Sequence, residues 1–142
     1  MTTVPPAIRD LARRLIAAEA ARESPPGRPG GSAGRVCEGL RVSLIRLAGA
    51  AGFHSLACRA VALAAAEVVT FHPPPVREDG SLEWAADAGP AGEGGAAVVA
   101  HLLGLLAALV GESLTRQLVS DVWPDIDGPE VDGPGGRAGG RL

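Results

Sequence analysis

The chain has 142 residues and a formal net charge of -3, which predicts one domain and argues against a nucleic-acid partner, because such domains usually carry a basic field. All 13 basic residues are arginines, and without a lysine the chain can form neither a Walker A phosphate loop nor a Schiff-base site. The lack of Lys and Tyr beside 20 glycines and 12 prolines matches GC-rich codons and points to a bacterial source.

Residues 4–23 are predicted to form an amphipathic helix. Apolar residues recur there at spacings of four, three and four, which is one helical stripe: Val4, Ile8, Leu11 and Leu15. The following residues, 24–34, contain three prolines and four glycines and predict a flexible linker. The helix is free to dock on its own chain or on another molecule. We expect it to bind a partner protein by presenting Ile8, Leu11 and Leu15 to a groove.

The main domain is predicted over residues 35–124 as an all-α bundle of four main helices, with the N-terminal helix tethered ahead of it. Its first two helices, 35–48 and 53–70, are separated by the stretch 49–52, in which paired glycines predict a tight turn. Because a short connection joins antiparallel neighbours, we expect these two helices to pack as a hairpin.

The helical period is lost over residues 71–93. Within this stretch Asp79 followed by Gly80 is a turn signal. The sequence allows two structures there, a small β-hairpin or a short helix at 82–86.

Residues 94–111, GGAAVVAHLLGLLAALVG, form an 18-residue stretch without a charge. As a helix it spans about 27 Å, slightly less than the roughly 30 Å hydrocarbon core of a bilayer, and glutamates rather than arginines flank it. Small residues form one stripe along this helix: Ala97, Ala100, Gly104, Ala107 and Gly111. We therefore expect the helix at the centre of the bundle, with the small stripe against helix 53–70, and keep a membrane span as an alternative.

The chain is predicted to end in a last helix, which Pro124 stops, and a disordered tail, 125–142, whose apolar content is too low for it to order itself. The predicted organisation thus has four parts: the helix 1–23, the linker 24–34, the bundle domain 35–124 and the tail 125–142.

Few residues in the sequence suggest a catalytic or metal-binding site. His54 and Cys58 stand four residues apart on one predicted helix, and Cys37 lies on the preceding helix. Zinc accepts imidazole and thiolate ligands in tetrahedral geometry, so these three residues define an alternative, a metal- or redox-linked protein. The pattern lacks a fourth ligand and a CxxC element, and we predict no metal and no cofactor. His101 is expected to be a core histidine that donates to a carbonyl or a carboxylate.

The run from RVCEGLRVSLIRLAGAAGFHSLACRAVALA through DGSLEW to VVAHLLGLLAALVGESLTRQLVSDVWP resembles a group of short bacterial proteins. It covers most of residues 35–124. No activity, ligand or partner is attached to that group, so the resemblance implies the domain limits only.

No catalytic motif is found, and the chain is not expected to be an enzyme. Two cysteines give no disulfide framework, and no apolar segment follows a basic start, which favours a reducing cytoplasm. The sequence predicts a small non-enzymatic interaction, adaptor or regulatory module of the bacterial cytoplasm, with a protein partner or a second copy of itself.

Overall fold

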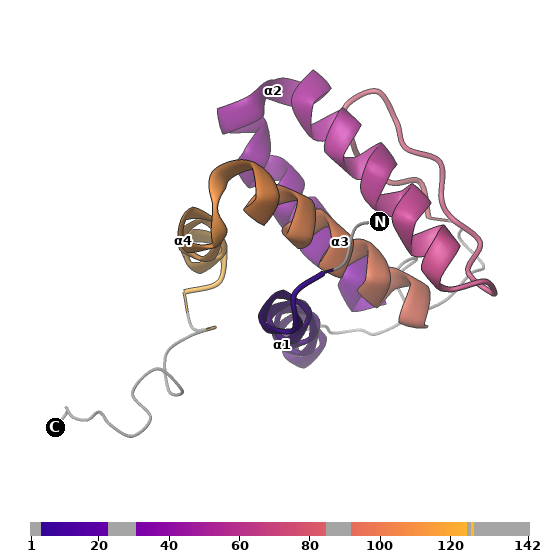
Figure 1. Cartoon of the computed structure of the whole chain (residues 1–142), viewed down its shortest axis with the longest axis horizontal. Helices are drawn as coiled ribbons and strands as arrows, with labels where there is room; N and C mark the ends of the chain where they lie inside the picture. Colours follow the sequence, from indigo (N-terminus) through magenta and orange to yellow (C-terminus); the bar gives the residue numbers. More distant parts are fainter. Residues whose placement is uncertain (1–3, 23–30, 85–91, 125, 127–142) are drawn as a thin grey trace, which may run out of the picture.

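The computed structural model of the chain describes residues 4–22, 31–84, 92–124 and 126. Over these residues the chain forms four helices and one isolated β-bridge, which confirms the all-α class (Figure 1). The helices are α1 (Pro6–Arg22), α2 (Gly31–Glu67), α3 (Gly92–Val110) and α4 (Glu112–Val122). The predicted tail lies outside the described residues apart from Ile126, as does the predicted linker apart from 31–34, which belong to α2.

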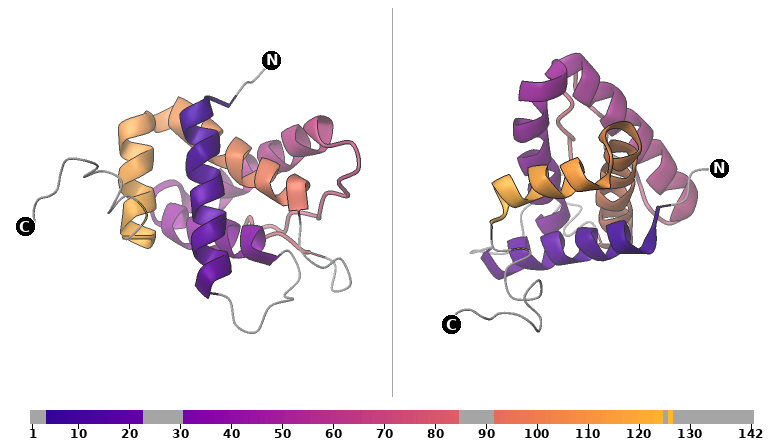
Figure 2. Two further views of the ribbon diagram at one scale, coloured as in Figure 1. Left: turned by 90° about the horizontal axis from the view of Figure 1, so that it is seen from below. Right: turned by 60° about the vertical axis from the view of Figure 1, so that its left-hand side comes forward.

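Helix α2 is bent at Gly49 into two arms, 31–48 and 50–67. Gly49 has φ 79° and ψ 166°, a conformation that is essentially restricted to glycine. The predicted helix break at 49–52 is therefore confirmed. The two arms diverge from this corner as a V instead of lying side by side as a closed hairpin (Figures 1 and 2).

A β-hairpin follows α2 and contacts both of its arms. Val76 and Leu82 form an antiparallel bridge, and the turn between them contains Gly80 at φ 86°. Gly80 lies against the ring of Phe53 on the second arm, while Asp79 forms an ion pair with Arg41 on the first. Of the two structures that the sequence left open, the hairpin is formed.

Helix α3 is the central helix, and ten of its 19 residues are buried, among them His101. Helices α2 and α3 are both long and apolar enough to cross a bilayer. However, the most apolar stretch of 18 residues in α3 is 56% buried inside the protein, whereas the corresponding stretch in α2 is 28% buried. Burial at the centre of the bundle is what the core-helix interpretation of 94–111 predicts.

Helix α1 docks on the bundle, and the side chains of Ile8, Leu11 and Leu15 are fully buried in the common core. These three residues were predicted to bind a partner, but in this arrangement their partners are other parts of the same chain. The physical reason is proximity. Only eight residues separate α1 from α2, so closing this connection costs little entropy compared with the apolar area that docking buries.

The small-residue stripe of α3 contacts α1 as well as the end of the second arm of α2, against which it was predicted to pack. Ala97 and Ala100 line a cleft of about 240 Å³ together with Ala12 of α1 and Glu67 at the end of α2. A Cβ added to Gly104 would lie 3.4 Å from Val4, immediately before α1. The contact with α1 was not predicted because α1 was not included among the packed helices.

We expect Gly104→Ala to leave the free energy of unfolding unchanged or to raise it by up to about 1 kcal/mol, because alanine favours the helix and a 3.4 Å contact is ordinary. Gly104→Leu extends three further carbon atoms toward Val4, which is buried, and should cost roughly 1–3 kcal/mol. Urea unfolding of both variants measures the two effects. A loss of stability in the alanine variant would contradict the arrangement of α1 against α3.

Candidate functional site

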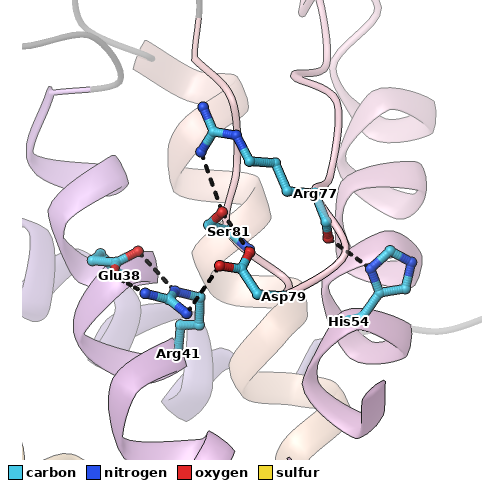
Figure 3. Close-up of polar contacts among 6 residues, drawn as sticks. All are labelled: Glu38, Arg41, His54, Arg77, Asp79 and Ser81. Carbon is cyan, nitrogen blue, oxygen red and sulfur yellow. Dashed lines mark hydrogen bonds and ion pairs between the residues drawn. The ribbon is translucent and has the colours of Figure 1, made fainter. Parts of the chain in front are cut away.

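A polar network holds the hairpin turn against α2 (Figure 3). Arg41 lies 3.6 Å from Asp79, and one carboxylate oxygen of Asp79 accepts hydrogen bonds from the amide and the hydroxyl of Ser81, at 2.9 and 2.7 Å. The Ser81 hydroxyl in turn accepts a hydrogen bond from Arg77 at 3.2 Å. The hydrogen bonds from Ser81 lower the pKa of Asp79, which keeps the carboxylate charged opposite Arg41.

The same turn orients His54 on the second arm. Nδ1 of His54 lies 2.8 Å from the carbonyl oxygen of Arg77 (Figure 3). A carbonyl only accepts hydrogen bonds, so Nδ1 carries the proton and Nε2 of the neutral ring has a free lone pair. Nε2 lies 3.3 Å from Sγ of Cys58, whose thiol is exposed. The structure therefore places a base beside a thiol and fixes the tautomer of that base.

Cys37 is not part of this arrangement. It is buried in the first arm of α2 and lines a small cavity of about 20 Å³ together with Phe53 and Leu102. Burial raises the pKa of its thiol to about 12. Among the described residues, no three His, Cys, Asp or Glu side chains are placed to hold a metal ion. The three-ligand site considered from the sequence, with Cys37, His54 and Cys58, is thus not assembled.

Glu19 is a buried carboxylate that joins three segments of the bundle. Its two oxygens accept hydrogen bonds from Nε1 of Trp123 at 2.7 Å and from Nε of Arg35 at 3.0 Å. Burial alone would raise the pKa of Glu19, but the hydrogen bonds from Trp123 and Arg35 and the nearby arginine charges bring it below its ordinary value. Glu19 therefore connects α1 with α2 and with the end of α4 as a structural carboxylate.

A second carboxylate, Glu67, binds His101. Nε2 of the buried His101 donates to Oε1 of Glu67 at 2.8 Å, and Arg9 of α1 donates to the same oxygen at 2.8 Å. The hydrogen bond from Arg9 lowers the pKa of Glu67, against the effect of burial, and that from His101 adds to it. This confirms the expectation that His101 is a core histidine bonded to a carboxylate. Its Nδ1 is buried without a hydrogen-bond partner in the described part of the chain.

An open cleft of about 770 Å³ lies where α1, the start of α2 and the hairpin meet. Two arginines and two glutamates line it together with Gly34, Leu82 and Trp84: Arg35, Arg77, Glu19 and Glu38. The formal charges cancel, and Arg35 is already paired with Glu19. The cleft therefore favours no ligand of either charge.

Large apolar side chains are exposed next to the two glycine corners of the bundle. One corner is Gly49 in α2, and the other is Gly111, with φ 95°, between α3 and α4. In Figure 1 the bend of α2 and the junction of α3 with α4 lie on the same side of the molecule. We call this group of side chains the apolar end, and its members are Leu47, Leu109, Val110 and Leu114, exposed by 63%, 69%, 41% and 42%.

Charged residues border the apolar end on both sides. Arg46, next to Leu47, is exposed and has no ion pair within the described residues. Glu112 begins α4 and pairs with Arg116 one turn later, at 3.4 Å. Sequence reasoning missed this surface because Leu109 and Val110 belong to a helix that is apolar on all sides, so its pattern does not show which end emerges from the core.

Comparison of the chain with protein-family models, with curated proteins and with solved structures finds no match.

Proposed function

We propose that the protein is a non-enzymatic interaction module of the bacterial cytoplasm that pairs with a second copy of itself through the apolar end. The observation that carries this proposal is the exposure of Leu47 and Leu109 by 63% and 69%. Clustered exposed apolar residues mark interaction sites, and bringing two such patches together removes both from water.

The charges around the apolar end favour a second copy as the occupant. Most soluble homo-oligomers are two-fold symmetric, so a patch that binds itself must be self-complementary. Arg46 and Glu112 stand on different elements at the border of this patch and carry opposite charges. In a two-fold pair, Arg46 of one copy would approach Glu112 of the other, which would share its exposed carboxylate between Arg46 and its own Arg116. The leucines would meet between these charges.

The non-enzymatic part of the proposal rests on the separation of reactive groups from clefts. His54 and Cys58 are the residues that resemble a base and a nucleophile, and neither lines the 770 Å³ cleft or the small cavity beside Cys37. The cytoplasmic part is supported by both cysteines being free thiols, which suits a reducing compartment.

Leu109→Glu is expected to weaken self-association at least about tenfold, because it places a charge within the proposed apolar contact. Sedimentation velocity over a wide range of protein concentration gives the dissociation constant of the parent and the variant. Val69→Glu is the matched control, since Val69 is an 89% exposed valine that lies outside the apolar end and should leave association unchanged.

The ion pair is tested separately by reversing charges. Arg46→Glu should weaken association, and adding Glu112→Arg to it should restore part of the loss. A parent chain that stays monomeric at every concentration would overturn the proposal, as would an equal effect of Val69→Glu. Binding of the parent to lipid vesicles through the same leucines would favour the membrane alternative instead.

A further inference from the structure

We propose that Cys58 is a site of thiol–disulfide exchange, with His54 as its base and a small carboxylate-bearing disulfide as its reactant. This site is separate from the apolar end, and its test does not depend on whether the protein self-associates.

The imidazole of His54 is held in one orientation. The hydrogen bond from Nδ1 of His54 to the Arg77 carbonyl, at 2.8 Å, fixes both the ring and its tautomer. Nε2 then has its lone pair available for the thiol proton of Cys58, 3.3 Å away. Proteins activate a thiol by placing a base beside it and a third group that orients the base. Cys58, His54 and the Arg77 carbonyl have this arrangement. Here the orienting group comes from the hairpin, 23 residues further along the chain than His54.

The thiol of Cys58 is accessible to a reactant from solution. Cys58 is exposed on the second arm of α2, and the exposed residues one helical turn away on either side, Ser55 and Ala62, are small. They leave room for a reactant larger than water. The adjacent Arg59 is exposed and has no ion pair in the part of the chain that the structure describes. Its positive charge favours a reactant with carboxylates, such as glutathione disulfide.

The proposed reaction balances without a further reagent. The thiol proton of Cys58 passes to Nε2 of His54, and the thiolate attacks one sulfur of the disulfide RS–SR. The S–S bond of the reactant breaks as a new bond forms between Sγ and one RS group. The other RS leaves as a thiolate and takes the proton back from His54 as RSH. Cys58 is thereby oxidised to a mixed disulfide, and one equivalent of the reactant is reduced to a thiol.

The product stays a mixed disulfide. The chain contains two cysteines, and the other, Cys37, is buried with its pKa raised to about 12. It is therefore not placed to displace the RS group from Cys58. Excess small thiol should reverse the modification by the same exchange.

The experiment treats the full chain with glutathione disulfide and maps the modified cysteine by peptide mass spectrometry over time. Modification is expected at Cys58, faster than at Cys58 of the urea-unfolded chain, and not at Cys37. His54→Asn is the informative variant, because its side-chain amide still donates to the Arg77 carbonyl but has no basic nitrogen. It should react at least about tenfold more slowly, and circular dichroism should show that it stays folded.

The pH dependence separates a base from a merely structural residue. Without a base, the rate at Cys58 in His54→Asn should rise about tenfold per pH unit while the thiol is protonated. The parent rate should rise less steeply, because His54 supplies the acceptor for the proton. Equal rates and equal pH profiles in parent and variant would overturn the proposal. A native Cys58 that reacts no faster than in the unfolded chain would overturn it as well.

Discussion

Replacing Glu19 by alanine is expected to lower the free energy of unfolding by about 3 kcal/mol. The variant leaves the indole N–H of Trp123 without its acceptor, and the Trp123 side chain is 2% exposed, so water does not replace the lost bond. It also removes the carboxylate that pairs with Arg35. Urea unfolding followed by tryptophan fluorescence measures the loss and reports directly on one of the partners.

Two further variants give this prediction its controls. Glu19→Gln keeps an oxygen that can accept from Trp123 and loses only the charge, so we expect a smaller loss, about 1–2 kcal/mol. Glu78→Ala removes an exposed glutamate from the hairpin and should change stability by less than about 0.5 kcal/mol. A Glu19→Ala variant as stable as Glu78→Ala would mean that the buried carboxylate does not join the three segments.

The same carboxylate should make stability depend on pH. The pKa of Glu19 is lowered in the folded protein from an ordinary value of 4.5. Its contribution is therefore complete above the unfolded pKa and is lost as the pH falls from about 4.5 through the lower folded pKa. Glu67 and Asp79 have lowered pKa values too, so the parent loses stability from several groups at once. The difference in stability between parent and Glu19→Gln isolates Glu19, and it should shrink over this acid range.

Sequence patterns predicted the features that depend on near neighbours. The corner at Gly49 and the turn at Gly80 both have positive φ, which glycine adopts at little cost, and each was indicated by local composition. The burial of α3 follows from a helix that is apolar on all sides, which has no stable place at the surface of a compact domain. Because the helix is buried, His101 inside it needed a hydrogen-bond acceptor. A carboxylate was one of the two acceptors expected, and a carbonyl was the other.

What the sequence did not predict depends on contacts between distant segments. A Pro/Gly linker allows α1 to dock on its own bundle or elsewhere, and only the packing of Ile8 and Leu11 decides between them. Glu19 continues the buried stripe four residues after Leu15, and this spacing was the available signal. It was missed because a glutamate on an apolar stripe is a core residue only if partners such as Arg35 and Trp123 arrive from elsewhere. Likewise, the distance between Cys37 and the His54–Cys58 pair depends on how far the arms of α2 diverge.

Gly80→Ala is expected to destabilise the protein by about 3 kcal/mol, from two effects that add. The first is backbone strain, since φ at Gly80 is 86° and alanine rarely adopts it. The second is overlap, because the new Cβ would lie 2.4 Å from Cδ2 of Phe53 and 3.3 Å from the backbone nitrogen of His54. Phe53 is 1% exposed, so its ring cannot move aside without disturbing the core.

Gly49→Ala separates the two effects, because Gly49 has a similar φ, 79°, but nothing within 4 Å of the added Cβ. It should cost about 1–3 kcal/mol from strain alone, and a larger loss for Gly80→Ala in urea unfolding measures the overlap with Phe53. If the two variants lose equal stability, the turn must swing away from Phe53 instead of overlapping it. That movement would separate the Arg77 carbonyl from His54 and slow the reaction at Cys58. A Gly80→Ala variant with both parental stability and a parental Cys58 rate would therefore contradict the placement of the hairpin against α2.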